Sequence, residues 1–234
     1  MTAPIVATRR ALLVIAKRPA PGHTKTRLSP TLLPAQAADL YECFLRDTLD
    51  VSRAVPAVTR FVHYSPDNAW DYFQQLAPDF ELRPQVGADL GERLDQVLTG
   101  CLADGFQQAV IMDSDSPTLP PAYVERAFSS LESADVVLGP CEDGGYYLIG
   151  LKAPQPRLLR EVPMSTAAVL RDTMALAAQA GLRVALLPSW YDVDTAVELE
   201  RLRQDLAGRS NGSAPHTRAY LSQLAPAALP AGTI

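Results

Sequence analysis

The sequence is poor in cysteine and has no long apolar run. Its three cysteines, Cys43, Cys101 and Cys141, are odd in number and far apart, which excludes a disulfide framework and a Cys-x-x-Cys metal site. We expect all three to be small buried apolar residues. Near the start, the longest apolar run covers only residues 11–16, between two basic pairs, which is too short for a membrane span or a secretory signal. The sequence therefore predicts a cytoplasmic protein.

The chain also lacks an excess of positive charge. It has 21 lysines and arginines against 26 aspartates and glutamates, so its formal net charge of −5 does not attract nucleic acid or an anionic membrane. An anionic ligand must instead be bound by a local group of cations. With 47% hydrophobic and 20% charged residues, the 234 residues have the composition of a globular protein with a substantial core.

Short apolar runs alternate with helical patterns along the chain. The runs predict strands at residues 11–16, 58–64, 80–85, 109–112, 136–138, 146–151 and 184–187. Apolar residues at helical spacing predict helices at residues 34–51, 67–76, 89–102, 120–131, 165–180 and 195–206. The turn-prone Asp143-Gly144-Gly145 predicts a hairpin and hence one antiparallel pairing. The pattern indicates an α/β fold, a three-layer α/β/α sandwich with a mostly parallel mixed sheet.

The domain organisation follows from where this alternation stops. We expect a single nucleotide-binding domain over residues 1–206. Residues 207–234 are expected to form a linker, a short helix at 215–224 and a mobile tail rich in alanine and proline.

Polar loops follow the predicted parallel strands, at the sheet edge where open α/β folds bind ligands. The first presents Lys25 and Arg27 on a turn shaped by Pro21 and Gly22, which suits the oxygens of a polyphosphate. The loop faintly resembles a Walker A motif, but it lacks the adjacent Gly-Lys pair and the earlier glycine, so we reject that motif. The alternative is a solvated basic loop.

Acidic residues follow two later elements. In extended backbone, Asp113 and Asp115 point to the same side, and paired carboxylates are costly unless a cation neutralises them. Mg²⁺ takes one or two protein carboxylates and completes its shell with phosphate oxygens and water, so the pair fits a metal-nucleotide site. Taken alone, the motif instead favours a turn capped by Asp113 and an Asp115–lysine pair. Asp194 could likewise hold a metal or cap the last helix.

Five segments together resemble one bacterial family. They are residues 16–28 (AKRPAPGHTKTRL), 87–94 (GADLGERL), 114–117 (SDSP), 139–150 (GPCEDGGYYLIG) and 192–195 (DVDT). They are similar, in order and over residues 11–206, to DUF2064, a group of nucleotide-diphospho-sugar transferase-like proteins. The resemblance implies the GT-A fold, shared with molybdenum cofactor guanylyltransferase and 2-phospholactate guanylyltransferase. Residues 163–166 depart from it, because Trp is expected before Ser-Thr, and this puts the acceptor in question.

The loops and the resemblance together imply four groups of site residues, some of which overlap. Those expected to bind the nucleotide are Lys17, Pro21, Gly22, Lys25, Arg27, Gly87, Asp89, Glu92, Arg93 and Asp113. Those expected near the acceptor or sugar are Glu142, Asp143, Gly144, Gly145, Ser165 and Thr166. Asp115 and Asp194 would hold Mg²⁺ or Mn²⁺. Catalysis would depend on Lys25, Arg27, Asp115 and Asp143.

These residues leave more than one reaction open. In nucleotidyl transfer, which is slightly favoured, an acceptor attacks the α-phosphate of a nucleoside triphosphate and expels pyrophosphate. In glycosyl transfer from a nucleotide-diphospho-sugar, Asp143 would act as the base toward the acceptor. A nucleotide-binding module without turnover is the third possibility, disfavoured by the intact acidic motifs. The expected partners are a nucleotide or nucleotide-sugar donor and a small-molecule acceptor, without nucleic acid or a membrane span; the sequence does not indicate the base, the acceptor or the oligomeric state.

Overall fold

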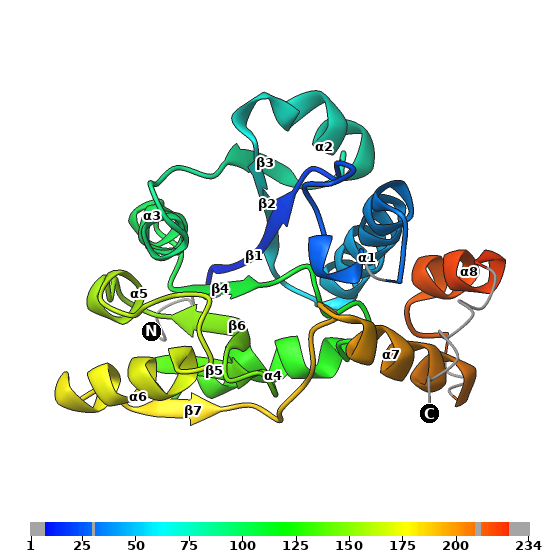
Figure 1. The fold of residues 1–234 in the computed structure, drawn as a ribbon. Coiled ribbons are helices and arrows are strands. Elements are labelled where there is room, and N and C mark those ends of the chain that lie inside the picture. Colours follow the sequence, from blue (N-terminus) through cyan, green and yellow to red (C-terminus); the bar gives the residue numbers. More distant parts are fainter. Residues whose placement is uncertain (1–7, 30, 209–211, 225–234) are drawn as a thin grey trace, which may run out of the picture.

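The computed structural model describes residues 8–29, 31–208 and 212–224, built around a sheet with the strand order β3-β2-β1-β4-β6-β5-β7 (Figure 1). The strands are β1 (Arg10–Lys17), β2 (Thr59–Ser65), β3 (Glu81–Pro84), β4 (Gln108–Met112), β5 (Val136–Pro140), β6 (Tyr146–Leu151) and β7 (Val184–Leu186). β6 is antiparallel to both of its neighbours, β4 and β5, and the other pairings are parallel. The predicted mixed, mostly parallel sheet and the hairpin within it are confirmed.

Helices cover both faces of this sheet, as Figure 1 shows. Within the described residues they are α1 (Pro34–Ala54), α2 (Trp70–Leu76), α3 (Leu90–Ala103), α4 (Pro121–Ser130), α5 (Arg157–Arg160), α6 (Val169–Gln179), α7 (Ala196–Gly208) and α8 (Pro215–Gln223), with short 3₁₀ turns η1 (Thr26–Leu28) and η2 (Asp67–Ala69). Successive strand side chains face opposite sides, so Leu12 and Val14 join one core with α1, α2, α4, α7 and α8. Ala11 and Leu13 join the other core, with α3, α5 and α6. The three-layer sandwich is confirmed.

Two local predictions were wrong. The helix predicted to begin at Ser165 begins at Val169, after Ala168, because Ser165 has a left-handed backbone with φ of 64°. The segment before α6 is held instead by the hairpin turn: the Leu170 N–H donates to the Gly144 carbonyl at 2.9 Å. Of the three cysteines, Cys101 and Cys141 are buried as expected, but Cys43 on α1 is only half-buried.

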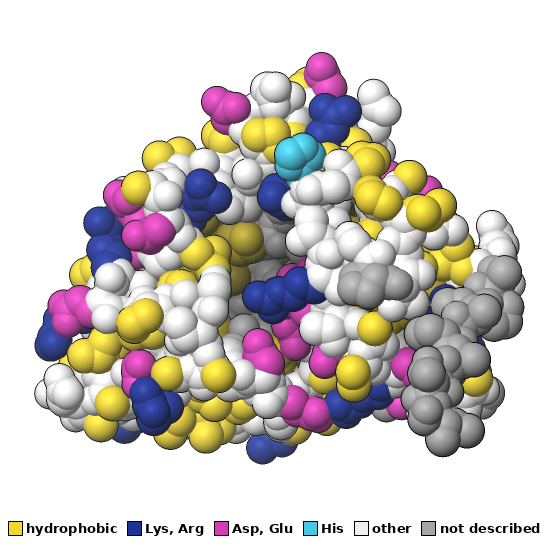
Figure 2. Space-filling model, in the orientation of Figure 1, with side chains coloured by type: hydrophobic (Ala, Val, Ile, Leu, Met, Phe, Trp, Pro, Cys, Tyr) yellow, Lys and Arg dark blue, Asp and Glu magenta, His cyan; other side chains and the backbone are white. Residues whose placement is uncertain are grey.

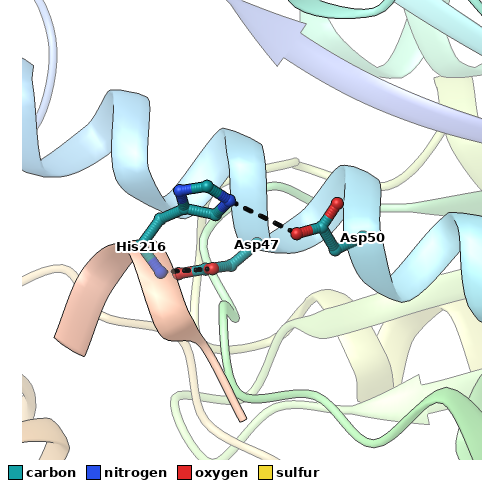
Figure 3. Close-up of side chains that lie close together, drawn as sticks. All are labelled: Asp47, Asp50 and His216. Atoms are coloured by element: carbon teal, nitrogen blue, oxygen red, sulfur yellow. Dashed lines mark hydrogen bonds and ion pairs between the residues drawn. The ribbon is translucent and has the colours of Figure 1, made fainter. Parts of the chain in front are cut away.

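Helix α8 is attached to α1 by a buried carboxylate (Figure 3). The N-cap residue of α8, Ala214, has no side chain that could accept a hydrogen bond from the first turn. Asp47 of α1 accepts these bonds instead, from the backbone N–H groups of His216 at 3.0 Å and Thr217 at 2.8 Å. Asp47 is 1% exposed, and burial raises the pKa of its carboxyl. The His216 ring adds an ion pair to Asp50, 3.4 Å from Nε2 to Oδ2.

The rest of the C-terminal segment is only partly described. The predicted mobile tail, residues 225–234, lies outside the described residues, and so do residues 209–211 of the predicted linker. Every helix in the described part of the chain is too short or too polar to cross a bilayer.

Removal of the Asp47 carboxylate is expected to weaken the attachment of α8. We expect Asp47→Ala to lower the free energy of unfolding by about 1–2 kcal/mol, the usual cost of losing a helix N-cap. The matched change Asp50→Ala removes only a half-exposed carboxylate and is expected to cost less than about 1 kcal/mol. Urea unfolding followed by circular dichroism measures both changes, and equal losses would contradict the capping role.

A second prediction concerns His63 of β2, which is 4% exposed and has no hydrogen-bond partner for either ring nitrogen among the described residues. Burial, with a smaller effect from the nearby Arg83 charge, lowers its pKa from 6.5 to about 4. The unfolded chain therefore takes up this proton below about pH 6.5, whereas the folded protein does so only near pH 4. The stabilisation that neutral His63 gives above pH 6.5 is lost as the pH falls to 4.

We expect His63→Phe to reduce the loss of unfolding free energy between pH 7 and pH 4 by up to about 3 kcal/mol. The control is His23→Gln, which changes an exposed ring on the loop after β1. Urea unfolding at several pH values tests this, and a His63→Phe profile that parallels the wild-type profile would show that His63 does not cause the pH dependence.

Candidate functional site

A cavity of about 910 Å³ opens at the carboxyl ends of the central strands. Its wall includes Lys17 at the end of β1, Ser65 at the end of β2 and Asp113 after β4. The hairpin turn before β6 and the loop after β7 close the other side. Figure 2 shows this hollow, with basic and acidic side chains around its mouth. The volume is within the usual range for small-molecule sites.

Lys25 joins three loops that are far apart in the sequence. Its Nζ lies 2.7 Å from Oδ1 of Asp115 and 2.7 Å from Oδ1 of Asp194. Arg27 approaches the second oxygen of Asp194 at 3.5 Å. Thus the three residues on which the predicted phosphate-and-metal site depends are in direct contact at one rim. The Asp115–lysine pair expected from the motif alone is also present, since its lysine is the one from the basic loop.

The loop after β1 is built to present Lys25. The Thr24 hydroxyl both accepts from the Ala20 N–H and donates to the Ala20 carbonyl, which closes the turn. Lys25 then has a left-handed backbone, φ 49° and ψ 40°, which turns its side chain inward over the Phe44 ring. Burial alone would lower the pKa of the Lys25 ammonium, but the two carboxylates outweigh burial and raise it. Lys25 is therefore charged and largely buried.

Five aspartates gather around the cavity: Asp113, Asp115, Asp143, Asp192 and Asp194. Burial and the neighbouring Asp115 raise the pKa of Asp113. Burial, followed by the charges of Asp143 and Asp194, raises the pKa of Asp192 to about 6. Acidic oxygens that repel one another in this way are a donor set that fits Mg²⁺ or Mn²⁺.

Within this acidic group, Asp143 and Asp192 also lie close to the Cys141 thiol. One ligand atom of each of these three residues lies within 4.8 Å of the others. For a hard cation such as Mg²⁺, the two carboxylates are the suitable ligands. The acidic group therefore extends from the Lys25 contact to the hairpin turn.

The alternative roles of the two acidic loops can now be compared with the geometry. Asp113 accepts a hydrogen bond from the Asp115 N–H at 3.3 Å, so it does brace its turn. Asp194 does not need to cap α7, because Thr195 and Glu198 do so: the Thr195 hydroxyl accepts from the Val197 N–H, and Glu198 accepts from the Thr195 N–H. The Asp194 carboxylate is left for Lys25 and Arg27.

Many of the predicted site residues line the cavity. They are Lys17, Arg27, Arg93, Asp113, Asp115, Asp143, Gly145, Ser165, Thr166 and Asp194. Lys25 lines a smaller hollow of about 270 Å³, whose wall shares Lys17, Arg27, Asp115 and Asp194 with the main cavity. The structure therefore brings residues from all five sequence segments to one face of the molecule.

The remaining predicted residues do not line the cavity but shape its surroundings. Asp89 caps α3 by accepting from the Glu92 N–H, and Glu92 accepts in return from the Ala88 N–H. Gly87 allows a close approach, since a Cβ there would lie 2.8 Å from the Arg93 nitrogen. Glu142 is bound by Arg201 at 2.6 Å, away from the cavity.

The other three such residues belong to turns. Pro21 and Gly22 form the exposed turn before Lys25. Gly144 lies against the segment before α6, and a Cβ on it would lie 2.1 Å from the Ala167 carbonyl oxygen. All three act on backbone shape in this structure.

Sequence reasoning assigned no role to several residues of the cavity wall, and Asp192 and Gln85 are two of them. Asp192 lies two residues before Asp194, and the argument that paired Asp113 with Asp115 could have found it. Gln85 follows β3, and its amide donates to the carbonyls of Ala16 at 3.0 Å and His63 at 2.8 Å. These two carbonyls belong to different strands, β1 and β2, so no local sequence pattern could reveal the role of Gln85.

Two solved structures and one enzyme of named activity resemble the chain over most of its length. A protein from Desulfovibrio desulfuricans G20 described as a nucleotide-diphospho-sugar transferase is 32% identical, with a TM-score of 0.85 over 92% of this chain and 95% of that one. The 2-phospho-L-lactate guanylyltransferase of Methanothermobacter thermautotrophicus is 31% identical over 207 residues, 86% of each chain. CMP:2-keto-3-deoxy-manno-octonic acid synthetase, solved with CTP, shares the fold at 12% identity and a TM-score of 0.56 over 86% of this chain and 99% of that one.

The fold, the site and these relatives define a transferase with the GT-A-like fold of nucleotidyltransferases and nucleotide-diphospho-sugar transferases. A family model described as "Uncharacterized protein conserved in bacteria (DUF2064)" matches residues 48–166. The chain belongs to the DUF2064 family.

Proposed function

We propose that this transferase moves a nucleotidyl group from a nucleoside triphosphate to a small acceptor. The observation that carries the proposal is the meeting of Lys25 and Arg27 with Asp115 and Asp194 at the rim of a cavity large enough for a nucleotide. The guanylyltransferase relative catalyses a reaction of this class by its name, which supports the same chemistry here.

In the proposed reaction, an acceptor oxygen attacks the α-phosphorus. The bond to the oxygen that bridges the α- and β-phosphates breaks, and pyrophosphate leaves with its electron pair. Lys25 and Arg27 would neutralise the charge that develops on the phosphates, with Lys17 and Arg93 farther along the cavity wall. Positioning and charge supply the catalysis, so no nucleophile from the protein is needed.

The acidic group would serve both the metal and the acceptor. A divalent cation held by Asp115 and Asp194, with Asp192 beside them, would neutralise charge on the leaving diphosphate. If the acceptor is a hydroxyl, Asp143 would take its proton; this role is supported by its exposed carboxylate, which lines the cavity next to Asp192. Gly145, whose N–H donates to Asp143 at 2.8 Å, would hold this carboxylate in place.

Glycosyl transfer is the second candidate, because the Desulfovibrio desulfuricans relative is described as a nucleotide-diphospho-sugar transferase. The same cations would then bind a departing nucleoside diphosphate. The two reactions differ in what is released. Incubation with nucleoside triphosphates, nucleotide sugars and candidate acceptors, with Mg²⁺ or Mn²⁺, should release pyrophosphate in the first case and nucleoside diphosphate in the second. Stabilisation by nucleotide with neither product would identify a binding module.

We also propose that residues 1–206 form the catalytic unit and that residues 207–234 are an appended segment, whose helix α8 packs on α1. The cytoplasmic location stays a prediction.

Asp115→Asn is expected to reduce metal-dependent turnover by at least about 100-fold, because it removes a charge at the phosphate rim but almost no volume. Circular dichroism should show the fold retained, since Asp194 still neutralises Lys25. The control is Asp135→Asn, which removes an exposed carboxylate paired with Arg183 at the opposite edge of the sheet and should leave turnover unchanged. Wild-type turnover in Asp115→Asn would refute the role given to this residue.

A further inference from the structure

Lys25 contacts both of the carboxylates that are proposed to hold a metal ion. We propose that its ammonium group is a built-in counter-ion that competes with a divalent cation for Asp115 and Asp194, so that the cation binds tightly only when phosphate oxygens draw Lys25 away. The inference rests on the proposed function for the ligands, a polyphosphate and a divalent cation. It does not depend on which group is transferred.

The competition follows from the distances. One oxygen of Asp115 and one of Asp194 each lie 2.7 Å from the same Nζ atom. A Mg²⁺ ion that bridged these two oxygens would lie about 2.1 Å from each. Such an ion would lie less than about 5 Å from Nζ, so the two cations repel each other and compete for the same two oxygens. The ammonium must move before both oxygens can bind a metal ion tightly.

The burial of Lys25 strengthens this competition. The Lys25 side chain is 5% exposed, whereas the two carboxylates are 37% and 36% exposed toward the cavity. A cation arriving from the cavity therefore meets carboxylates that Lys25 already neutralises in part, and it is repelled by an ammonium charge that water screens poorly. Metal binding without phosphate is expected to be weak for this reason.

The structure also provides the place to which Lys25 can move. The adjoining hollow of about 270 Å³ is lined by Lys25 together with Lys17 and Arg27. A polyphosphate bound by these cations would offer oxygens to the Lys25 ammonium within the reach of its flexible stem. The backbone at Lys25 is fixed by the closed turn at Thr24, so only the side chain has to move.

A shared residue makes the two binding events dependent on each other. Phosphate gives Lys25 a new partner and frees the carboxylates, and the metal then occupies them. By thermodynamic linkage, each ligand must raise the affinity for the other by the same factor. In this way the protein would load its metal together with the donor rather than before it.

The test is Mn²⁺ binding in the absence of phosphate, measured by calorimetry and by electron paramagnetic resonance. We expect Lys25→Met to bind Mn²⁺ on the order of tenfold more tightly than the wild type, because the competing charge is gone and the apolar stem is kept. The matched control is Arg27→Met, which removes an equal charge from a side chain that is 72% exposed and 3.5 Å from Asp194. Its affinity should change by less than about threefold, since water screens that charge.

A Lys25→Met protein that binds Mn²⁺ no more tightly than the wild type would overturn the proposal. An equal gain in Arg27→Met would also overturn it, because general charge and not competition would then be the cause. If Lys25→Met does not fold by circular dichroism, Lys25→Gln replaces it with the same expectation. Tripolyphosphate, which has no base, provides the second measurement.

With EDTA present, tripolyphosphate should raise the melting temperature of the wild type and do so less in the Lys25 variant; an equal shift in both would contradict the movement of Lys25 to phosphate. None of these measurements requires turnover. Suppose that Lys25→Met binds Mn²⁺ tenfold more tightly but the wild type releases no pyrophosphate. That result would refute the proposed function and leave this inference standing.

Discussion

The contact of one lysine with two aspartates links three loops at the rim of the cavity. Lys25 comes from the loop after β1, Asp115 from the loop after β4 and Asp194 from the loop before α7, and both carboxylates lie 2.7 Å from its ammonium. Two carboxylates that both contact one ammonium group would repel each other if the lysine were absent. The charged side chains of the site are therefore paired with one another, and a charged ligand must displace some of these pairs.

The sheet explains why these loops meet. β1 and β4 are adjacent and parallel, so the loops that follow them leave the same edge at neighbouring positions. β6 enters antiparallel between β4 and β5, and its hairpin turn therefore reaches the same edge from the other direction. Because both faces of the sheet are covered by helices, this edge is where a large cavity can open without exposing the core.

Most of the fold could be predicted from the sequence because its central strands, such as β1, β4 and β6, are largely buried on both faces. Such strands appear as short apolar runs, and the runs at β1, β4 and β6 mark those strands to within about one residue. α5 was not predicted because its four residues are too few to show a helical period. The start of α6 was misplaced because the conformation of Ser165 depends on packing against the hairpin turn, which no local pattern records.

The site was predictable to the extent that its residues act through charge. Lys25, Asp115 and Asp194 were expected to meet because their loops lie at the carboxyl ends of the strands and the family resemblance groups them, and the structure does bring them into contact. Asp89 and Glu92 occupy the spacing of a helix capping box, and the structure uses Asp89 as the N-cap of α3, while Glu92 accepts from the Ala88 N–H one residue before it. A motif of acidic residues is compatible with helix capping or with a place in the charged site, and only the direction of the carboxylate distinguishes these two roles. Gln85 is neutral, and its role depends on two carbonyls from different strands.

Helix α1 connects the C-terminal helix to the loop that carries Lys25. Asp47, which holds α8, lies one helical turn after Phe44, and the Lys25 ammonium lies 5.8 Å from the centre of the Phe44 ring. Tyr41, a further turn back, accepts a hydrogen bond from the Lys17 N–H and shares another with Ser114 beside Asp115. The same helix therefore contacts both α8 and the side chains around Lys25, so a substitution that loosens α8 would act on the helix that supports the basic loop.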